Sequence, residues 1–137
     1  MNNKYIFVYG LLKSMYDNEP AKFIRKNCTL IEEGSIPGML FDLGTYPGAV
    51  FDPSSSSLVF GEVYRIDQNE EDLVRFLDEF ERVGTQFKQP NEYIRKMVPV
   101  TTNNGIIEAS SYLYNWNLDG LKLIESGRYE NQKGNRG

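Results

Sequence analysis

Short runs of β-branched and aromatic residues, separated by turns rich in glycine, proline and asparagine, make up most of this chain. The clearest run is Leu58–Ile66. Two further runs, 93–101 and 106–116, flank Asn103-Asn104-Gly105, a sequence typical of a tight β-hairpin turn. Helical patterns are restricted to two segments, so strands and helices do not alternate strictly. This organisation predicts an α+β fold whose mostly antiparallel or mixed sheet can curl into a barrel.

Two segments have helical character. Residues 19–26 carry a proline in the first turn, where its missing N–H is tolerated. The second helix follows Asp67 or Asn69, either of which can cap it, and Gly84 is its expected stop. Its apolar residues recur at i, i+3, i+4 and i+7, which predicts a face packed on the core. That face consists of Leu73, Phe76, Leu77 and Phe80.

Glycine and proline divide the remaining β-rich sequence. A strand is expected at Cys28–Glu33, followed by tight corners at Pro37-Gly38 and Pro47-Gly48 between short strands. Gly61, inside the strand at 58–66, marks either a β-bulge or the close approach of another segment.

The length and composition bound the domain organisation. A chain of 137 residues with 40% hydrophobic residues fits one ordinary domain with a real core, which we assign to residues 1–129. Residues 130–137 are Asn, Gln, Lys, Gly, Arg and Glu, and this tail is expected to be frayed and disordered.

Several classes of function are disfavoured by the same data. The net charge is −4 and the basic residues form no cluster in the sequence, which argues against nucleic acid as a partner. No apolar run approaches the ~20 residues of a membrane span, and the N-terminus lacks the features of a signal peptide. The single cysteine, Cys28, excludes an internal disulfide, and we interpret it as a buried structural thiol. These features together predict a cytoplasmic protein.

The chain contains no histidine. Ser-His and Cys-His nucleophile pairs within one chain are therefore excluded, as are metal sites built on histidine. If the protein transfers protons, the carrier is expected to be a carboxylate, a lysine or a tyrosine.

One candidate site is the loop that follows the first strand. The run Tyr5-Ile6-Phe7-Val8-Tyr9 reads as a buried strand, and Gly10 can adopt backbone angles closed to other residues. A loop leaving the sheet at Gly10-Leu11-Leu12 would expose consecutive N–H groups that can bind a carboxylate or an oxyanion. The alternative interpretation is simply a first strand and its turn.

A second candidate is Glu81, at the end of the second helix. At ~100° per residue, Asp78 lies ~140° from the centre of the apolar stripe, Glu79 ~120° and Glu81 only ~80°. Glu81 thus stands at the rim of the buried face and at the helix C-terminus, and both conditions raise the pKa of a carboxyl group. The alternatives are a solvated Glu81 and, as another candidate acid, Glu62, which a half-exposed sheet would point outward.

Four sequence pieces follow one another through nearly the whole chain: Tyr9-Gly10-Leu11-Leu12, Gly61-Glu62-Val63-Tyr64, Leu77-Asp78-x-x-Glu81 with Tyr93-x-Arg95, and Ile124-x-Ser126-Gly127. In this order they resemble the γ-glutamylcyclotransferase-like (AIG2-like) proteins. Two positions differ from the family pattern: Leu11 stands where a hydroxyl residue is usual, and Arg82 where glycine often follows the glutamate.

This resemblance implies a small mixed, mostly antiparallel barrel with flanking helices, and an enzyme that needs no cofactor or metal. The implied reaction releases 5-oxoproline from a γ-glutamyl amine or peptide, with Glu81 as general base and acid. Gly10, Leu11 and Leu12 would bind the small-molecule substrate, Tyr9 would line the pocket, and Tyr93 would orient Glu81 or the substrate, unless both tyrosines only pack in the core. The alternative function is a non-catalytic protein of the same fold that binds a small carboxylate. The leaving amine and the oligomeric state stay open.

Overall fold

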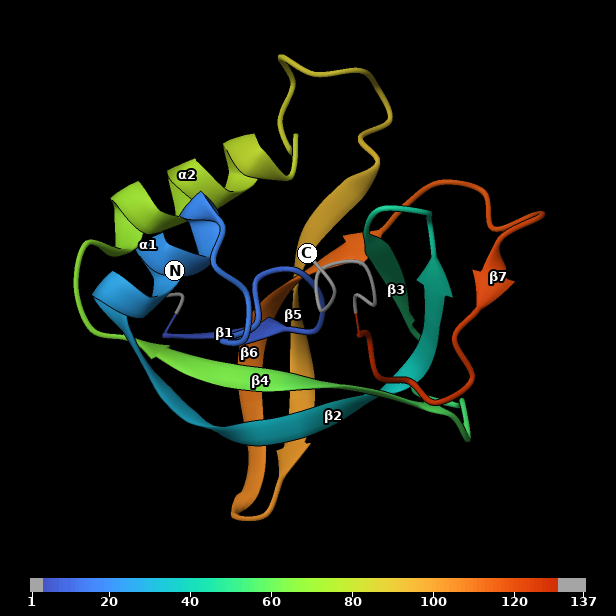
Figure 1. Cartoon of the computed structure of the whole chain (residues 1–137), viewed down its shortest axis with the longest axis horizontal. Coiled ribbons are helices and arrows are strands. Elements are labelled where there is room, and N and C mark those ends of the chain that lie inside the picture. Colours follow the sequence, from blue (N-terminus) through green and yellow to red (C-terminus); the bar gives the residue numbers. More distant parts are fainter. Residues whose placement is uncertain (1–3, 131–137) are drawn as a thin grey trace.

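The computed structural model of the chain describes residues 4–130 (Figure 1). Apart from Glu130, the tail expected at residues 130–137 lies outside the described residues. The elements are β1 (Tyr5–Val8), α1 (Glu19–Asn27), β2 (Cys28–Asp42), β3 (Pro47–Phe51), β4 (Leu58–Ile66), α2 (Glu70–Phe80), β5 (Tyr93–Thr102), β6 (Gly105–Tyr114) and β7 (Lys122–Leu123).

The sheet closes into a barrel of five strands in the order β2-β4-β1-β6-β5, with β5 returning to β2 at the pair Ser35 and Thr101. The strands β1 and β6 pair in parallel at Ile6 and Ser110, and the other pairings are antiparallel. Strands β3 and β7 extend the sheet from the far end of β2. The predicted α+β fold, a mixed and mostly antiparallel barrel with flanking helices, is confirmed.

Both helices lie on the same side of the barrel, next to one another (Figure 1). The rings of Phe23 in α1 and Phe76 in α2 lie 4.9 Å apart between centroids. Leu73 and Leu77 are fully buried, as the apolar spacing predicted. Asn69 is the residue that precedes α2, and its side-chain amide donates to Asn27 Oδ1 (2.9 Å) instead of capping the helix.

The strand β2 runs without interruption through the segment where a corner was expected at Pro37-Gly38. That prediction was wrong. Pro37 pairs with Leu58 and Gly38 with Phe51, so both residues lie inside the sheet. Proline has an extended φ that suits a strand, and a Cβ at Gly38 would lie 1.9 Å from the carbonyl oxygen of Val50. The glycine therefore serves a close backbone approach instead of a turn.

Gly61 has the second of its two predicted roles. The register shift of the β2–β4 pair falls between Leu30 and Glu32, so the bulge lies elsewhere. A Cβ on Gly61 would lie 2.4 Å from the carbonyl oxygen of Val8 and 2.8 Å from Cζ of Phe7. The strand β4 thus runs very close to the end of β1, where the chain leaves the sheet.

The buried side chains form two clusters. One fills the barrel and is built around Phe7, Ile36 and Val98. The other lies between the barrel and the two helices and contains Leu73 and Leu77. Strand β1 contributes to both, because its alternate side chains point to opposite faces. Within residues 4–130 no helix has the length and apolar character needed to cross a membrane.

Candidate functional site

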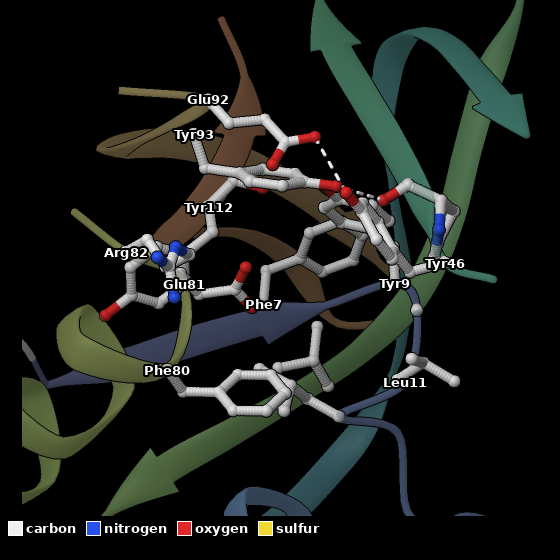
Figure 2. A pocket seen from close by; sticks show the side chains of 14 residues that line it. Phe7, Tyr9, Leu11, Tyr46, Phe80, Glu81, Arg82, Glu92, Tyr93 and Tyr112 are labelled. Carbon is white, nitrogen blue, oxygen red and sulfur yellow. Dashed lines mark hydrogen bonds between the residues drawn. The ribbon is translucent and has the colours of Figure 1, made fainter. Parts of the chain in front are cut away.

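A cavity of about 210 Å³ opens between the loop after β1, the end of α2 and the start of β5 (Figure 2). All six candidate residues from the sequence line it: Glu81 from the helix end, Tyr93 from β5, and the run from Tyr9 to Leu12. The full lining comprises Phe7, Val8, Tyr9, Gly10, Leu11, Leu12, Tyr46, Pro47, Phe80, Glu81, Arg82, Glu92, Tyr93 and Tyr112.

Gly10 begins the loop on one side of the cavity. It does not adopt the positive φ that the sequence suggested, so its conformation is open to other residues. Its carbonyl oxygen accepts a hydrogen bond from the N–H of Lys13 (3.1 Å), which turns the chain. A Cβ at Gly10 would lie 2.6 Å from Cγ of Pro47. Glycine is needed here because the loop packs directly against Pro47.

The loop is held in place from outside the cavity. Both the N–H and the hydroxyl of Ser14 donate to the carboxylate of Glu62, at 2.7 and 2.8 Å. The side chain of Asn18 donates to the carbonyl of Leu11 (2.8 Å). In the described part of the chain, the N–H groups of Gly10, Leu11 and Leu12 make no hydrogen bond. Glu62 therefore clamps the loop that carries these N–H groups.

Glu81 caps the C-terminus of α2 in a Schellman motif. The N–H of Val83 donates to the carbonyl of Asp78 (2.8 Å), and the N–H of Arg82 donates to the carbonyl of Glu79 (3.2 Å). Arg82 adopts the left-handed conformation that this motif requires, with φ 59°. The position after Glu81 is thus one where glycine would fit without strain, and the motif fixes the backbone of Glu81.

The carboxyl group of Glu81 points into the cavity (Figure 2). Burial, together with the smaller effect of the negative charge of Glu92, raises the pKa of Glu81 to about 7. The guanidinium group of Arg82, the residue next to Glu81, contacts the Phe87 ring. Its central carbon lies 5.3 Å from the centroid of that ring. Glu81 is therefore able to exchange a proton near neutral pH.

Glu92 is a second acid of the cavity that the sequence analysis missed. The hydroxyl of Tyr46 donates to Glu92 Oε2 (2.9 Å). Burial and this hydrogen bond raise the pKa of Tyr46 to about 12. Glu92 directly precedes Tyr93 of the family-like block, and that adjacency was the available signal. Its position depends on the loop before it, which carries no periodic pattern.

The hydroxyls of two cavity tyrosines, Tyr9 and Tyr93, form hydrogen bonds with the protein backbone. The Tyr9 hydroxyl donates to the carbonyl of Tyr112 (2.6 Å) and accepts from the N–H of Ala49 (3.2 Å). The Tyr93 hydroxyl donates to the carbonyl of Pro47 (2.7 Å). Burial raises the pKa of both phenols far above the usual range, so both stay neutral. Their rings form walls, and their hydroxyls fix those walls to the barrel.

The side chains of the cavity offer two carboxylates, aromatic rings and a guanidinium. Among residues 4–130, no three His, Cys, Asp or Glu side chains are grouped so that they could hold a metal ion. The arrangement can bind a small anion at the loop N–H groups and exchange a proton at Glu81.

A sequence model of the family described as "Gamma-glutamyl cyclotransferase, AIG2-like" matches residues 6–131, a range that includes every residue of the cavity. The gamma-glutamylcyclotransferase family protein YtfP of Escherichia coli K12 is 37% identical over 123 residues, which cover 89% of this chain and 92% of YtfP.

Two solved structures are similar in fold. YkqA from Bacillus subtilis superposes with a TM-score of 0.68 at 29% identity, over 93% of this chain and 40% of YkqA, so this chain spans less than half of that protein. An AIG2-like protein from Mus musculus superposes with a TM-score of 0.73 at 24% identity, over 96% of this chain and 92% of the mouse chain. At that identity the likeness concerns the fold.

Proposed function

Because the chain belongs to the AIG2-like gamma-glutamyl cyclotransferase family, we propose that it releases 5-oxoproline from a γ-glutamyl amine or peptide, with Glu81 as general base and acid. One observation carries the proposal. A carboxyl group with a pKa near 7 lines the same small cavity as three consecutive loop residues whose N–H groups make no hydrogen bond within residues 4–130. A base and an anion-binding loop are the two parts that this cyclisation requires.

In the proposed reaction the α-amine of the substrate attacks its own γ-carbonyl carbon. A C–N bond forms and closes the five-membered ring, the carbonyl oxygen takes up negative charge, and the bond to the leaving amine then breaks. The α-ammonium group has an unperturbed pKa of about 8, so it must lose a proton before it attacks. Glu81 accepts that proton and returns it to the leaving nitrogen. The attacking nitrogen loses a second proton when it becomes the amide nitrogen of the ring, and the departing amine takes up one proton as it becomes an ammonium ion, so the protons balance and the enzyme is unchanged.

The pKa of Glu81 suits both halves of this proton transfer. An ordinary glutamate is too weak a base to take a proton from an ammonium group efficiently. Burial and the charge of Glu92 bring the pKa of Glu81 to about 7, within about one unit of the ammonium group. The proton can therefore pass in either direction at small cost in free energy.

The loop after β1 would bind the anionic part of the substrate. The N–H groups of Gly10, Leu11 and Leu12, which have no hydrogen-bond partner among the residues that the structure describes, would donate to the α-carboxylate or to the developing oxyanion. A leucine side chain at position 11 supplies no hydroxyl, so binding would rest on backbone donors alone. Tyr9 and Tyr93 would contribute ring surface against the glutamyl chain. The proposed reaction involves no metal, no nucleotide and no protein nucleophile.

A panel of γ-glutamyl compounds assayed for 5-oxoproline tests the proposal. The panel varies the leaving amine at constant glutamyl group, and the product is quantified by chromatography. The wild-type protein is expected to convert at least one compound, and Glu81→Gln is expected to lose nearly all of that conversion, leaving only a small residual rate that is measured at high enzyme concentration. Glu79→Gln is the matched control, because it removes an exposed carboxylate from the same helix.

The alternative function is a non-catalytic protein that binds a small carboxylate through the same loop. It is favoured if no compound of the panel yields 5-oxoproline while glutamate or 5-oxoproline itself binds in calorimetry. Under this alternative Glu81→Gln changes the affinity only modestly. Turnover that survives unchanged in Glu81→Gln contradicts the proposed mechanism.

A further inference from the structure

We propose that Asp78 is a positioning residue that holds Glu81 over the cavity by tying the last turn of α2 to the barrel through Arg95 and Tyr112. The inference rests on the proposed function of Glu81. It assigns to Asp78 and Arg95 a role that the proposed chemistry itself does not use.

The connection between Asp78 and the barrel consists of three hydrogen bonds. Arg95 Nε donates to Asp78 Oδ1 (2.8 Å) and Arg95 Nη2 donates to Asp78 Oδ2 (3.1 Å), a bidentate pair. The hydroxyl of Tyr112 also donates to Asp78 Oδ1 (2.7 Å). The side chains of Asp78 and Arg95 are 23% and 32% exposed, so water screens the pair less than it screens a surface pair.

These bonds continue to the opposite wall of the cavity. Tyr112, which donates to Asp78, accepts a hydrogen bond at its own carbonyl from the hydroxyl of Tyr9. Tyr9 directly precedes the loop at Gly10. A chain of hydrogen bonds therefore links the helix end that carries Glu81 to the segment that carries the loop N–H groups.

Asp78 also fixes the helix end through its backbone. Its carbonyl accepts the N–H of Val83, one of the two hydrogen bonds of the Schellman motif around Glu81. Glu81 is three residues after Asp78, almost one helical turn. A shift of the Asp78 side chain along the barrel would move Glu81 with it.

Apolar packing alone would hold the last turn of α2 only weakly. Leu73 and Leu77 are buried and anchor the middle of α2, whereas Phe80 is 45% exposed. The helix has another ion pair, Arg75 with Asp72, whose side chains are 71% and 63% exposed and which stays within the helix. Asp72 thus provides a matched control: the same residue type, the same helix and a similar partner, without a link to the barrel.

The test measures kinetics in two backgrounds. Asp78→Asn keeps the shape of the side chain and breaks the bidentate pair with Arg95. It is expected to lower kcat by roughly 10- to 100-fold, with KM changed less than about threefold. In the Glu81→Gln background, the same substitution is expected to lower the residual rate by less than about twofold, because the group that it positions is already absent. Asp72→Asn is expected to leave kcat unchanged.

A second measurement reports on the position of Glu81 and does not depend on enzyme activity. In a carbon-13 NMR titration of the glutamate carboxyl groups, Glu81 of the folded wild-type protein should titrate near pH 7. In Asp78→Asn and Arg95→Lys the midpoint should fall toward that of an ordinary glutamate, because the carboxyl group gains access to water. Asp72→Asn should keep the wild-type midpoint. Circular dichroism confirms that each variant is folded at the temperature used.

The inference is overturned if Glu81→Gln abolishes turnover while Asp78→Asn retains the wild-type kcat and Glu81 midpoint. An equal loss of rate from Asp78→Asn in both backgrounds would show a general structural role instead, and would also overturn it. Full turnover in Glu81→Gln is a separate outcome that contradicts the proposed role of Glu81 in catalysis. The titration would then still test whether Asp78 positions the Glu81 carboxyl group.

Discussion

Glu81 and Glu92 lie in the same cavity because the loop between them is closed by Gly84 and Asn91. The N–H of Gly84 donates to Asn91 Oδ1 (2.9 Å), and the side-chain amide of Asn91 donates back to the carbonyl of Gly84 (3.0 Å). The two carboxyl groups are thereby brought into one cavity, where the charge of Glu92 disfavours ionisation of Glu81.

The pH dependence of turnover should report this coupling. For the proposed reaction, kcat is expected to rise with pH through a midpoint near 7, as Glu81 loses its proton. Glu92→Gln removes the repulsion that raises the pKa of Glu81, so the midpoint should move to lower pH. The measurement is kcat against pH, with Glu79→Gln as the control. An unmoved midpoint in Glu92→Gln would show that Glu81 does not respond to the charge of Glu92.

The stability of the fold should depend on pH through Glu81 as well. The pKa of Glu81 is about 7 in the folded protein and 4.5 in the reference state. Between these values the folded state binds a proton that the unfolded state releases, so the free energy of unfolding falls as pH rises and levels off above about 7. Glu81→Gln should therefore gain stability over wild type, by up to about 3 kcal/mol at pH 8 and little below pH 4.5.

Urea denaturation at several pH values measures this difference. The control is again Glu79→Gln, which removes an exposed carboxylate from α2. A gap between Glu81→Gln and wild type that stays constant with pH would contradict the burial of the Glu81 carboxyl group.

The periodic features of the sequence predicted the fold well. The wrong prediction of a corner at Pro37-Gly38 is explained by a close backbone contact. The spacing of Leu73, Phe76 and Leu77 located α2 and its buried face, but Phe80 continues the same spacing and lines the cavity at 45% exposure. Periodicity records which face is apolar and not whether a core or a cavity lies against it. Pro37-Gly38 resembled a corner because a sequence does not reveal that a partner strand presses against the glycine.

The candidate site was predicted where a local signal existed. Glu81 stood out by its angle on the helix, and Gly10 by its place after a strand. Apart from its adjacency to Tyr93, Glu92 has no such signal. The loop that carries it to the cavity is shaped by hydrogen bonds of Asn91 with Gly84, seven residues away, and with Asn115, 24 residues away. The hydrogen bond from the Tyr93 hydroxyl to the carbonyl of Pro47 likewise could not be predicted, because it joins two segments that are 46 residues apart in the sequence.

Arg82 occupies a left-handed position, which predicts a difference between two substitutions. Arg82→Gly and Arg82→Ala both remove the contact with the Phe87 ring, but only alanine keeps a Cβ at φ 59°. The glycine variant should therefore be the more stable of the two by about 1 kcal/mol. Thermal and urea denaturation of the pair measure it. Equal stabilities would show that the left-handed residue is not strained in this motif.

The contact of Gly10 with Pro47 predicts a coupled pair of substitutions. Gly10→Ala would place a methyl group 2.6 Å from Cγ of Pro47 and is expected to cost about 2 kcal/mol of stability. In a Pro47→Ala background, which lacks that ring carbon, the same change should cost at least about 1 kcal/mol less. A double-mutant cycle by urea denaturation checks this. Independent, additive effects would show that the loop does not press on Pro47.

The hydrogen bond from Tyr9 to the carbonyl of Tyr112 joins residues that are 103 positions apart. During synthesis, the loop after β1 is made first, and it can form its side of the cavity only after β6 has left the ribosome. A nascent chain released before that strand would hold the proposed base on α2 and the loop after β1, yet no enclosed space between them. Competence for a ligand should accordingly arise in one late step of synthesis instead of accumulating as the chain grows.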